Sequence, residues 1–476
     1  MKKSLTLLSI LFINQLAISQ SIVFTQCYNG TFGSGQFIHA FICDTTTSGN
    51  YLMVGGQATM GFSQYLYGVI DRQGAVLWQK DSAIIDTSNG MHSASFNNGK
   101  RTLDNGYVFT GAVTNFSMSN TEGIFILKTD SIGNEVWRKN ISNYQQGGAE
   151  GIYLSEDSSI LISGYIKNST LNSYHPYILK LSSLGDSIFM NEFAINCSNS
   201  PSIFYINDKY YICGETYNID TVTQQVKHGY FILTTDTDGN YLNLKVVIDS
   251  LFTRYIGNFT KTIDDKLILT YTERDTSGSG FVQVVMMDTL ATVIWQETLV
   301  NQPYMTSAVC QLPNGEIITS YQNNKVRKFD LLGNTLWMHD LAAPPSHSYS
   351  SFQSNSIFPI NNSTFIISST ESVSSPGAAW LTLTEIMDTS LTIILETDKV
   401  PFSIYPNPTS NTFTLAPFSS MNKILIQIIN YQGSIVHIEE LTGSTEYKVH
   451  HRLSSGMYFI RLFDGKNSFV RKLIVQ

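Results

Sequence analysis

Four glutamates are the first candidates for chemistry in this chain of 476 residues. They are Glu150, Glu215, Glu273 and Glu371, and three of them follow a strand-like segment that recurs along the chain. A carboxylate beside a cavity can act as a general acid or base. Repetition of this kind is more typical of a shared structural role, so we expect no catalytic residue among them.

Histidines are scattered over different parts of the chain without pairing, at His39, His92, His175, His228, His339 and His347. The sequence contains no His-Glu-x-x-His pair, no phosphate-binding loop and no Gly-x-Ser-x-Gly nucleophile turn. These patterns favour a protein that is not an enzyme and that has no cofactor and no metal site. Separate repeats can nevertheless contribute to one site, which spacing in sequence does not reveal.

The five cysteines are Cys27, Cys43, Cys197, Cys213 and Cys310. Their number is odd, and no two have the spacing of a metal clamp. Two local disulfides, Cys27–Cys43 and Cys197–Cys213, are compatible with an exported protein. Buried single thiols are equally compatible with the strand patterns around Cys213 and Cys310.

A frame of Asp, two residues, Gly, three residues and Trp recurs along the chain. Clear copies start at Asp71, Asp130, Asp288 and Asp330, and weaker ones at Ser182, Asp236 and Asp388. We assign the Asp to a turn, the Gly to the chain reversal and the Trp to the joint with the next repeat. The residues that carry these structural roles are Asp71, Trp78, Asp130, Gly133, Trp137, Gly185, Asp236, Gly239, Trp295, Asp330, Gly333 and Trp337.

A calcium loop is the alternative for one copy of the frame. Asp236, Asp238 and Gly239 resemble the start of such a loop, but position 245 is Lys where the loop needs Glu. The turn is therefore the favoured interpretation.

A second recurrent strand precedes each frame, and turn residues stand before most of its copies. Its copies include Tyr51–Gly55, Tyr107–Gly111, Ile160–Gly164 and Tyr210–Gly214. Four short strands per repeat are typical of a propeller blade, and seven units with two apolar faces must close into a ring. We expect an all-β chain with a seven-bladed β-propeller at 20–397, in which the segment 22–26 completes the last blade and displaces 391–396. An open β-solenoid is the alternative.

Composition and the N-terminus bear on location and partners. The net charge of -8 argues against nucleic acid and anionic membranes as partners. Lys2, Lys3 and the apolar run from Leu5 to Ile13 predict a signal peptide at 1–19. No later apolar stretch has the length of a transmembrane segment.

The composition changes after Lys399, and strict alternation predicts a small antiparallel β-sandwich at 398–476, similar to an Ig-like module. This tail resembles the type A C-terminal sorting domain of the type IX (Por) secretion system. The resemblance is carried by Tyr405, Pro406, Asn407, Pro408, Gly433, Gly456, Tyr458 and Lys472. It implies recognition of residues 400–476 by the type IX translocon, and a final location that is secreted or at the outer-membrane surface.

The body resembles secreted propeller repeats of Bacteroidetes and, more distantly, quinoprotein propellers. Asp71, Asp130 and Asp330 have the Asp–Gly–Trp spacing of the quinoprotein motif, but the adjacent cysteines of many such dehydrogenases are absent. A shared scaffold is favoured over a shared cofactor. We expect a non-catalytic binding or scaffold protein with a protein or glycan ligand. The alternative is an enzyme acting on extracellular polysaccharide or a quinoprotein-like oxidoreductase.

Overall fold

The computed structural model describes 21 segments of the chain and contains no helix within them. They are 20–28, 37–59, 62–82, 85–86, 90–115, 121–141, 144–167, 173–198, 201–219, 226–249, 253–275, 279–300, 308–321, 325–340, 349–373, 379–388, 402–417, 423–430, 435–442, 446–463 and 468–476. The predicted signal peptide at 1–19 and the segment 391–396 lie outside these residues.

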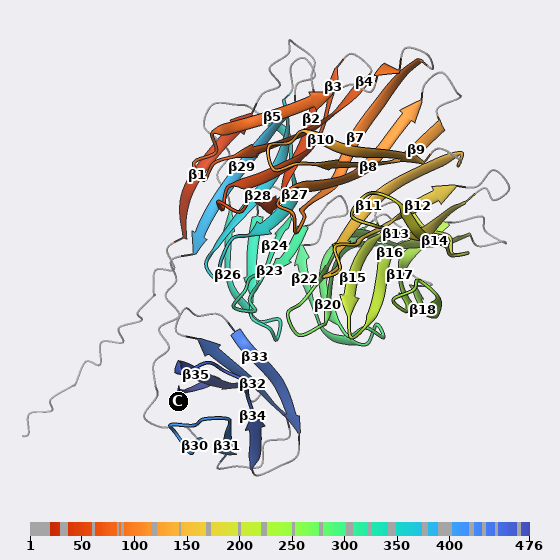
Figure 1. The fold of residues 1–476 in the computed structure, drawn as a ribbon. Helices are drawn as coiled ribbons and strands as arrows, with labels where there is room; N and C mark the ends of the chain where they lie inside the picture. Colours follow the sequence, from red (N-terminus) through yellow and green to blue (C-terminus); the bar gives the residue numbers. More distant parts are fainter. Residues whose placement is uncertain are drawn as a thin grey trace, which may run out of the picture.

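Seven antiparallel sheets follow one another along the chain and form a ring (Figure 1). We number these sheets as blades 1 to 7. The strands of blades 1 to 4, in chain order, are β2 (Phe37–Thr45), β3 (Tyr51–Thr59), β4 (Phe62–Ile70) and β5 (Val76–Ser82); β7 (Gly90–Arg101), β8 (Tyr107–Asn115), β9 (Thr121–Thr129) and β10 (Glu135–Ile141); β11 (Gln146–Leu154), β12 (Ile160–Lys167), β13 (Tyr174–Leu181) and β14 (Ser187–Glu192); β15 (Ser202–Ile206), β16 (Lys209–Ile219), β17 (Val226–Thr235) and β18 (Tyr241–Ile248).

Blades 5 and 6 repeat this order, and blade 7 recruits a strand from the other end of the body. Their strands are β19 (Thr253–Lys261), β20 (Leu267–Arg274), β21 (Gly280–Met287) and β22 (Val293–Val300); β23 (Ala308–Gln311), β24 (Ile317–Tyr321), β25 (Lys325–Phe329) and β26 (Thr335–Asp340); β27 (Tyr349–Pro359), β28 (Thr364–Val373), β29 (Ala379–Asp388) and β1 (Gln20–Tyr28). A short strand, β6 (Ile85–Asp86), also pairs with the start of β7.

The predicted clasp is confirmed, because β1 is the outermost strand of blade 7. It pairs antiparallel with β29 from Gln20 opposite Asp388 to Tyr28 opposite Leu381. The first strand of the body therefore completes the sheet made by the last three. This arrangement joins the two ends of the ring through a ladder of backbone hydrogen bonds.

Each pair of neighbouring blades shares a hydrophobic core, and the last of these cores joins blade 7 to blade 1. In that core, Ile42 and Met53 of blade 1 pack in one cluster with Ile366 and Leu383 of blade 7. Tyr51 also donates a hydrogen bond of 2.8 Å to Glu385 across the same joint. The ring is closed, as the two apolar faces of each repeat predict.

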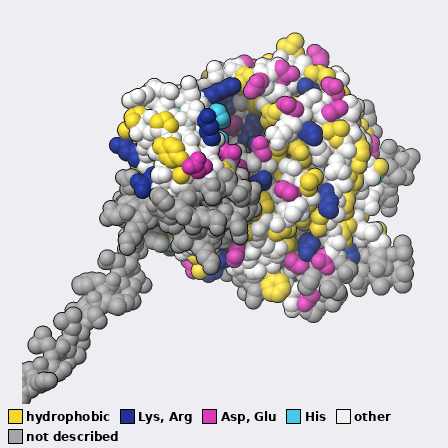
Figure 2. Space-filling model, turned by 90° about the horizontal axis from the view of Figure 1, so that it is seen from below, with side chains coloured by type: hydrophobic (Ala, Val, Ile, Leu, Met, Phe, Trp, Pro, Cys, Tyr) yellow, Lys and Arg dark blue, Asp and Glu magenta, His cyan; other side chains and the backbone are white. Residues whose placement is uncertain are grey.

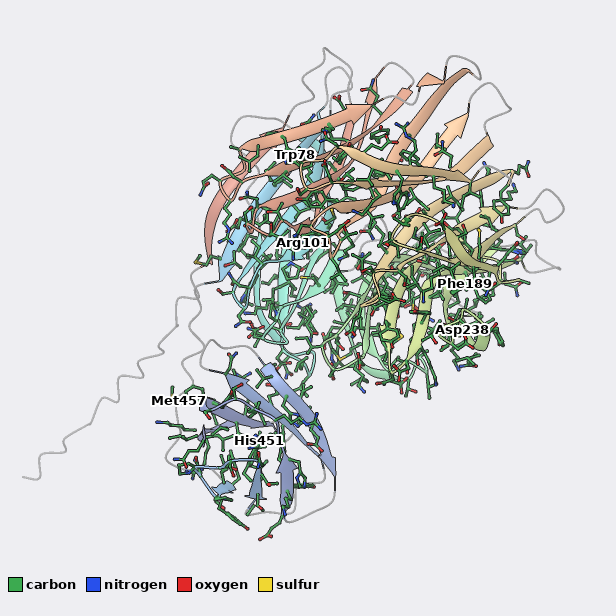
Figure 3. The ribbon with its side chains drawn as sticks, viewed as in Figure 1. Trp78, Arg101, Phe189, Asp238, His451 and Met457 are labelled. Atoms are coloured by element: carbon green, nitrogen blue, oxygen red, sulfur yellow. The ribbon has the colours of Figure 1, made fainter. Side chains whose placement is uncertain are left out.

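In four of the frames the aromatic residue packs on the turn glycine of the next blade. A Cβ added at Gly133 would lie 2.7 Å from the Trp78 ring, and one at Gly185 would lie 2.9 Å from the Trp137 ring. Phe189 covers Gly239 in the same way, and Figure 3 shows Phe189 beside the turn that holds Asp238. Two independent features favour glycine at this turn position. Its φ is positive, and the aromatic ring occupies the space that a side chain would need.

The tail forms a separate sandwich of two sheets (Figure 1). One sheet holds β30 (Phe402–Tyr405), β31 (Thr412–Pro417) and β34 (Tyr447–His450), and the other holds β33 (Ile435–Thr442), β32 (Lys423–Asn430), β35 (Gly456–Phe463) and β36 (Ser468–Val475). Phe402, Phe413, Ile428 and Ile460 are buried between the sheets. The Ig-like antiparallel sandwich expected for the tail is thus confirmed.

Replacing Gly133 by Ala tests the packing between blades. We expect Gly133→Ala to lower the free energy of unfolding by ~3 kcal/mol, of which ~1 kcal/mol is the cost of a positive φ and the rest is displacement of the Trp78 ring. Gly49→Ala is the matched control, because Gly49 also has a positive φ but its added Cβ would meet the flexible side chain of Arg72. Urea unfolding followed by tryptophan fluorescence measures both variants, and equal losses would contradict the proposed role of the ring.

Candidate functional site

A cavity lies at the centre of the ring and is lined mainly by the first strands of six blades. Its volume is about 910 Å³, and we call it the central channel. Strands β2, β7, β11, β15, β19 and β27 contribute lining residues in the described part of the chain. Because these strands come from six blades, the channel collects residues that are far apart in sequence.

Four of the lining strands carry a β-bulge at the same place. The bulge residues are Asn97, Glu150, Gly257 and Asn355, each standing between the two residues at which the strand register shifts. Each bulge residue lies five positions before the first residue of the turn that follows. Those turns begin at Thr102, Ser155, Thr262 and Ile360. A bulge adds one residue to a strand and re-aims its side chain. Three of the bulge residues, Asn97, Glu150 and Gly257, line the channel.

The recurrent glycine of the second strand has a physical reason at these bulges. A Cβ added at Gly111 would lie 1.9 Å from the carbonyl oxygen of Ser95, and one at Gly164 would lie 2.0 Å from that of Gly148. Both clashes are with the backbone of the neighbouring first strand, just before its bulge. The sequence predicted that this glycine permits a close approach near the axis. In the structure the close approach is between the backbones of the first and second strands of one blade.

Asn97 and Glu150 form a polar contact between blades 2 and 3 in the channel wall. The Asn97 amide donates to Oε1 of Glu150 at 2.8 Å and to the carbonyl of Ala149 at 3.4 Å. Burial in the wall raises the pKa of Glu150 to about 8, and the hydrogen bond from Asn97 opposes this rise only in part. Glu150 is therefore mostly protonated at neutral pH and can both donate and accept a hydrogen bond.

The rest of the channel wall combines amides, aromatic rings and a few charges. The described lining residues of these kinds are Asn98, Asn258, Phe41, Tyr153, Tyr165, Phe204, Phe259, Asp44, Lys100 and Arg101. Arg101 lies in the interior of the ring in Figure 3. Aromatic faces and amide groups in a concave site are suited to ring stacking and to hydrogen bonds with hydroxyl groups.

A smaller cavity of about 430 Å³ adjoins the channel between blades 4 and 5, and we call it the side chamber. It shares Ser202, Gly257, Asn258 and Phe259 with the channel wall. Glu215 and His228 also line it, and Nδ1 of His228 lies 2.7 Å from Oε1 of Glu215. The structure thus brings together one of the four glutamates and one of the six histidines that the sequence left unpaired.

The remaining candidates from the sequence lie elsewhere or in structural contacts. Glu273 is buried on β20 and faces Arg254 at 3.5 Å. His175 is buried against Glu192, at 3.0 Å, and His339 lies half-buried on β26. The side chains of Glu371, His39, His92 and His347 lie outside the described residues.

The Asp carboxylates of the frame accept hydrogen bonds from backbone N–H groups of their own turns. Oδ1 of Asp130 accepts the backbone N–H groups of Ile132 at 3.0 Å and Asn134 at 2.7 Å. Asp71, Asp236, Asp288 and Asp330 accept the same pair of bonds, two and four residues on. Two of the frame indoles also donate a hydrogen bond to the next blade, from Trp137 to Ser183 at 3.1 Å and from Trp295 to Leu331 at 3.0 Å.

Trp337 of the frame stacks on Phe365 of blade 7, with ring centroids 6.4 Å apart. The turn glycines Gly239 and Gly333 have positive φ, and Gly333 packs on the Trp295 ring.

Within the described residues, no group of three or more His, Cys, Asp or Glu side chains is placed to hold a metal ion. Among the described channel residues, none belongs to the Asp–Gly–Trp frame.

Four cysteines are buried free thiols, namely Cys43, Cys197, Cys213 and Cys310. The local disulfide Cys197–Cys213 is therefore not formed. Burial raises the pKa of each of these thiols well above its ordinary value, so they remain protonated and unreactive. The side chain of Cys27 lies outside the described residues.

The tail motif ties the end of the chain to the edge of the sandwich. The Asn407 side chain donates to the carbonyl of Lys472 at 2.7 Å and accepts the N–H of Ile474 at 2.9 Å, so it pairs with β36 as a strand would. Tyr405 donates to Glu446 at 2.8 Å, and Tyr458 to the carbonyl of Ser454 at 2.9 Å. Pro406 and Pro408 flank Asn407, Gly456 begins β35, and Gly433 lies outside the described residues.

Residues 403–476 match the secretion system C-terminal sorting domain. No curated protein matches this chain. In the described residues, no helical segment reaches the length and hydropathy of a membrane span.

Several solved structures are similar to this chain at very low identity. A protein of unknown function from Dyadobacter fermentans is 9% identical over 78% of this chain and 99% of that chain, with a TM-score of 0.42. Drosophila plexin A, in complex with semaphorin 1b, is 7% identical over 77% and 87%, with a TM-score of 0.48. An ulvan lyase, described as a new family of polysaccharide lyase, is 9% identical over 74% and 95%, with a TM-score of 0.47.

Because each of these TM-scores is below 0.5, the architecture rests on the sheet topology and not on these likenesses. The topology gives seven antiparallel sheets, six with four strands and one with five, in a closed ring followed by a sandwich. The sorting domain indicates export to the cell surface or the medium. The chain is thus an exported β-propeller protein that carries a secretion system C-terminal sorting domain at residues 403–476.

Proposed function

We propose that the exported propeller is a binding protein whose ligand is a glycan chain held in the central channel. The supporting observation is the composition of the channel wall, where the Asn97–Glu150 pair stands among amides and aromatic rings. A protonated Glu150 can donate to one hydroxyl group and accept from another. Tyr153 and Tyr165 add ring faces on which a sugar can stack.

The charge of the protein also fits an uncharged or weakly acidic ligand better than a polycation or polyanion. Figure 2 shows acidic and basic side chains interspersed among uncharged ones on one face of the molecule. The channel lining includes two basic residues, Lys100 and Arg101, together with Asp44 and the largely protonated Glu150. Hydrogen bonds and stacking, which depend little on salt, would therefore carry most of the affinity.

An enzyme acting on extracellular polysaccharide is the second candidate, and one observation favours it. Glu150 has the raised pKa of a general acid and lies in the wall of a cavity. The two functions differ in whether the bound glycan is recovered intact. The quinoprotein alternative receives no support from the described channel residues, which are suited to hydroxyl groups.

The sorting tail supplies the proposed route of export. We infer that the chain divides into a signal peptide at 1–19, the propeller at 20–397 and the sorting domain at 398–476. The type IX translocon would recognise residues 400–476 as a folded unit with its own core. The propeller would then act at the cell surface or in the medium.

Binding by the central channel is tested with defined hexasaccharides. The probes are β-1,4-linked glucose, β-1,4-linked xylose and α-1,4-linked galacturonate, measured by calorimetry with mature protein. We expect at least one probe to bind, and Tyr153→Ala to weaken it about tenfold, which corresponds to ~1.4 kcal/mol. Tyr241→Ala, at an exposed tyrosine on the outermost strand of blade 4, is the matched control. Equal affinity in both variants would contradict the channel site, and shortened products in mass spectra would establish the enzyme instead.

The raised pKa of Glu150 predicts a pH dependence of stability. Burial favours the protonated form in the folded state, whereas the unfolded glutamate ionises near pH 4.5. The free energy of unfolding of the wild type, relative to Glu150→Gln, should therefore be highest below pH 4.5 and fall as pH rises to about 8, by at most ~1.4 kcal/mol per pH unit. Guanidinium unfolding between pH 4 and 9 measures it. Glu156→Gln, at an exposed position, is the control, and a pH-independent difference for Glu150→Gln would refute the assignment.

Deleting residues 400–476 tests the route of export. We expect the truncated protein to pass the inner membrane and accumulate in the periplasm, because the signal that directs it across the outer membrane has been removed. Cell fractionation and surface labelling of the producing bacterium measure this. Normal surface display of the truncated protein would contradict a sorting role for the tail.

A further inference from the structure

His228 lines the side chamber, and one of its ring nitrogens is fixed by Glu215. A carboxylate only accepts hydrogen bonds, so Nδ1 of His228 carries the hydrogen in the 2.7 Å contact with Glu215. In neutral His228 the other nitrogen, Nε2, is then an acceptor. Within the described residues Nε2 has no hydrogen-bond partner, and the side chain keeps 21% of its surface exposed. Neutral His228 therefore carries a lone pair that has no partner among the described residues, on a side chain that lines the side chamber.

Glu215 holds this orientation through contacts with three separate elements. Its Oε1 accepts the hydroxyl of Ser198 at 2.7 Å as well as the bond from His228, and its Oε2 accepts the backbone N–H of Ile256 at 2.9 Å. Ser198 precedes β15, and Ile256 lies on β19 of the next blade. Glu215 therefore acts as a positioning residue that fixes both the tautomer and the ring plane of His228.

His175 shows what a purely structural histidine looks like in the same protein. It is buried, and Nδ1 lies 3.0 Å from Glu192 while Nε2 lies 3.1 Å from the hydroxyl of Ser173. Both ring nitrogens of His175 are used within the protein. His228 differs because its second nitrogen has no partner among the described residues and its ring lines a cavity, which is the arrangement expected of a group that receives a ligand.

The walls of the side chamber match a single sugar ring. Tyr255 is 38% exposed and packs against His228 with ring centroids 4.8 Å apart. Ile256 and Phe259 add apolar surface, and the hydroxyl of Ser202 and the amide of Asn258 add polar groups. Because Ser202 and Asn258 also line the central channel, a glycan in the channel would lie directly beside the chamber.

We propose that the side chamber is a subsite for one sugar unit, in which Nε2 of His228 accepts a hydrogen bond from a ring hydroxyl. The subsite rests on the proposed function of the central channel and adds to it the residues that choose the sugar at one position. A unit that lacks the hydroxyl would leave the nitrogen without a partner and would bind more weakly.

The experiment compares His228→Ala and Glu215→Gln with His339→Ala in calorimetric titrations of the three hexasaccharides named above. We expect His228→Ala to weaken the bound probe at least tenfold, because it removes the acceptor. Glu215→Gln should weaken it less, because the acceptor remains but its orientation is lost. His339→Ala, on β26 of blade 6, should have wild-type affinity. Thermal unfolding of each variant verifies that it is folded.

Nuclear magnetic resonance of protein with ¹⁵N-labelled histidine tests the same contact without a substitution. In the free protein at pH 8 we expect His228 as the Nδ1–H tautomer, and the Nε2 resonance should shift when the best-binding hexasaccharide is added. A Nε2–H tautomer, or an Nε2 resonance unchanged at saturating probe, would overturn the subsite.

The outcomes separate the subsite from the function on which it rests. Wild-type affinity in His228→Ala, together with weakened binding in Tyr153→Ala, would overturn the subsite and leave the channel intact. If the wild type binds none of the three probes, both the subsite and the channel site are overturned. Loss of affinity in His228→Ala with a shifted Nε2 resonance in the wild type would establish the contact.

Discussion

The structure depends on one constraint, which is that each blade must bury both of its faces. Every pair of consecutive blades shares its own hydrophobic core, from blades 1 and 2 around to blades 7 and 1. An open stack of the same units would leave two such faces in water, at ~25 cal/mol for each Å² of apolar surface. The clasp between β1 and β29 and the packing of frame aromatics on neighbouring glycines follow from this closure.

Closure also creates the candidate site. Seven sheets that meet around one axis bring their first strands close together, and the bulges at Asn97, Glu150 and Gly257 direct side chains and backbone to the channel. At two of these bulges the adjacent strand approaches so closely that only glycine fits, as Gly111 and Gly164 show. The same repeat that stabilises the ring therefore also shapes the cavity at its centre.

The sequence was sufficient to predict the seven blades, the clasp and the sorting tail, because each leaves a local and repeated pattern. Asp130, Gly133 and Trp137 act within one turn and its neighbour, so their spacing is visible along the chain. The channel was not predicted, because Asn97 and Glu150 come from different blades and meet only after the ring closes. A signal was present nonetheless, since Asn97, Glu150 and Gly257 each stand five positions before a Thr or Ser that opens a turn.

The pairing of Glu215 with His228 was missed for a related reason. Sequence repetition favoured a structural role for Glu215, and Glu215 does have three protein partners. What sequence could not show is that one of these partners, His228, faces a cavity beside the channel. Only the arrangement of blades 4 and 5 distinguishes it from His175, whose two nitrogens are both bound.

The central claim is that the closed ring builds a glycan site on its axis. A crystal structure of the mature protein with a bound hexasaccharide tests it most directly. We expect the sugar chain to lie against Tyr153 and the Asn97–Glu150 pair in the central channel. A chain bound only on the outer strands of the blades, with an empty channel, would contradict this account.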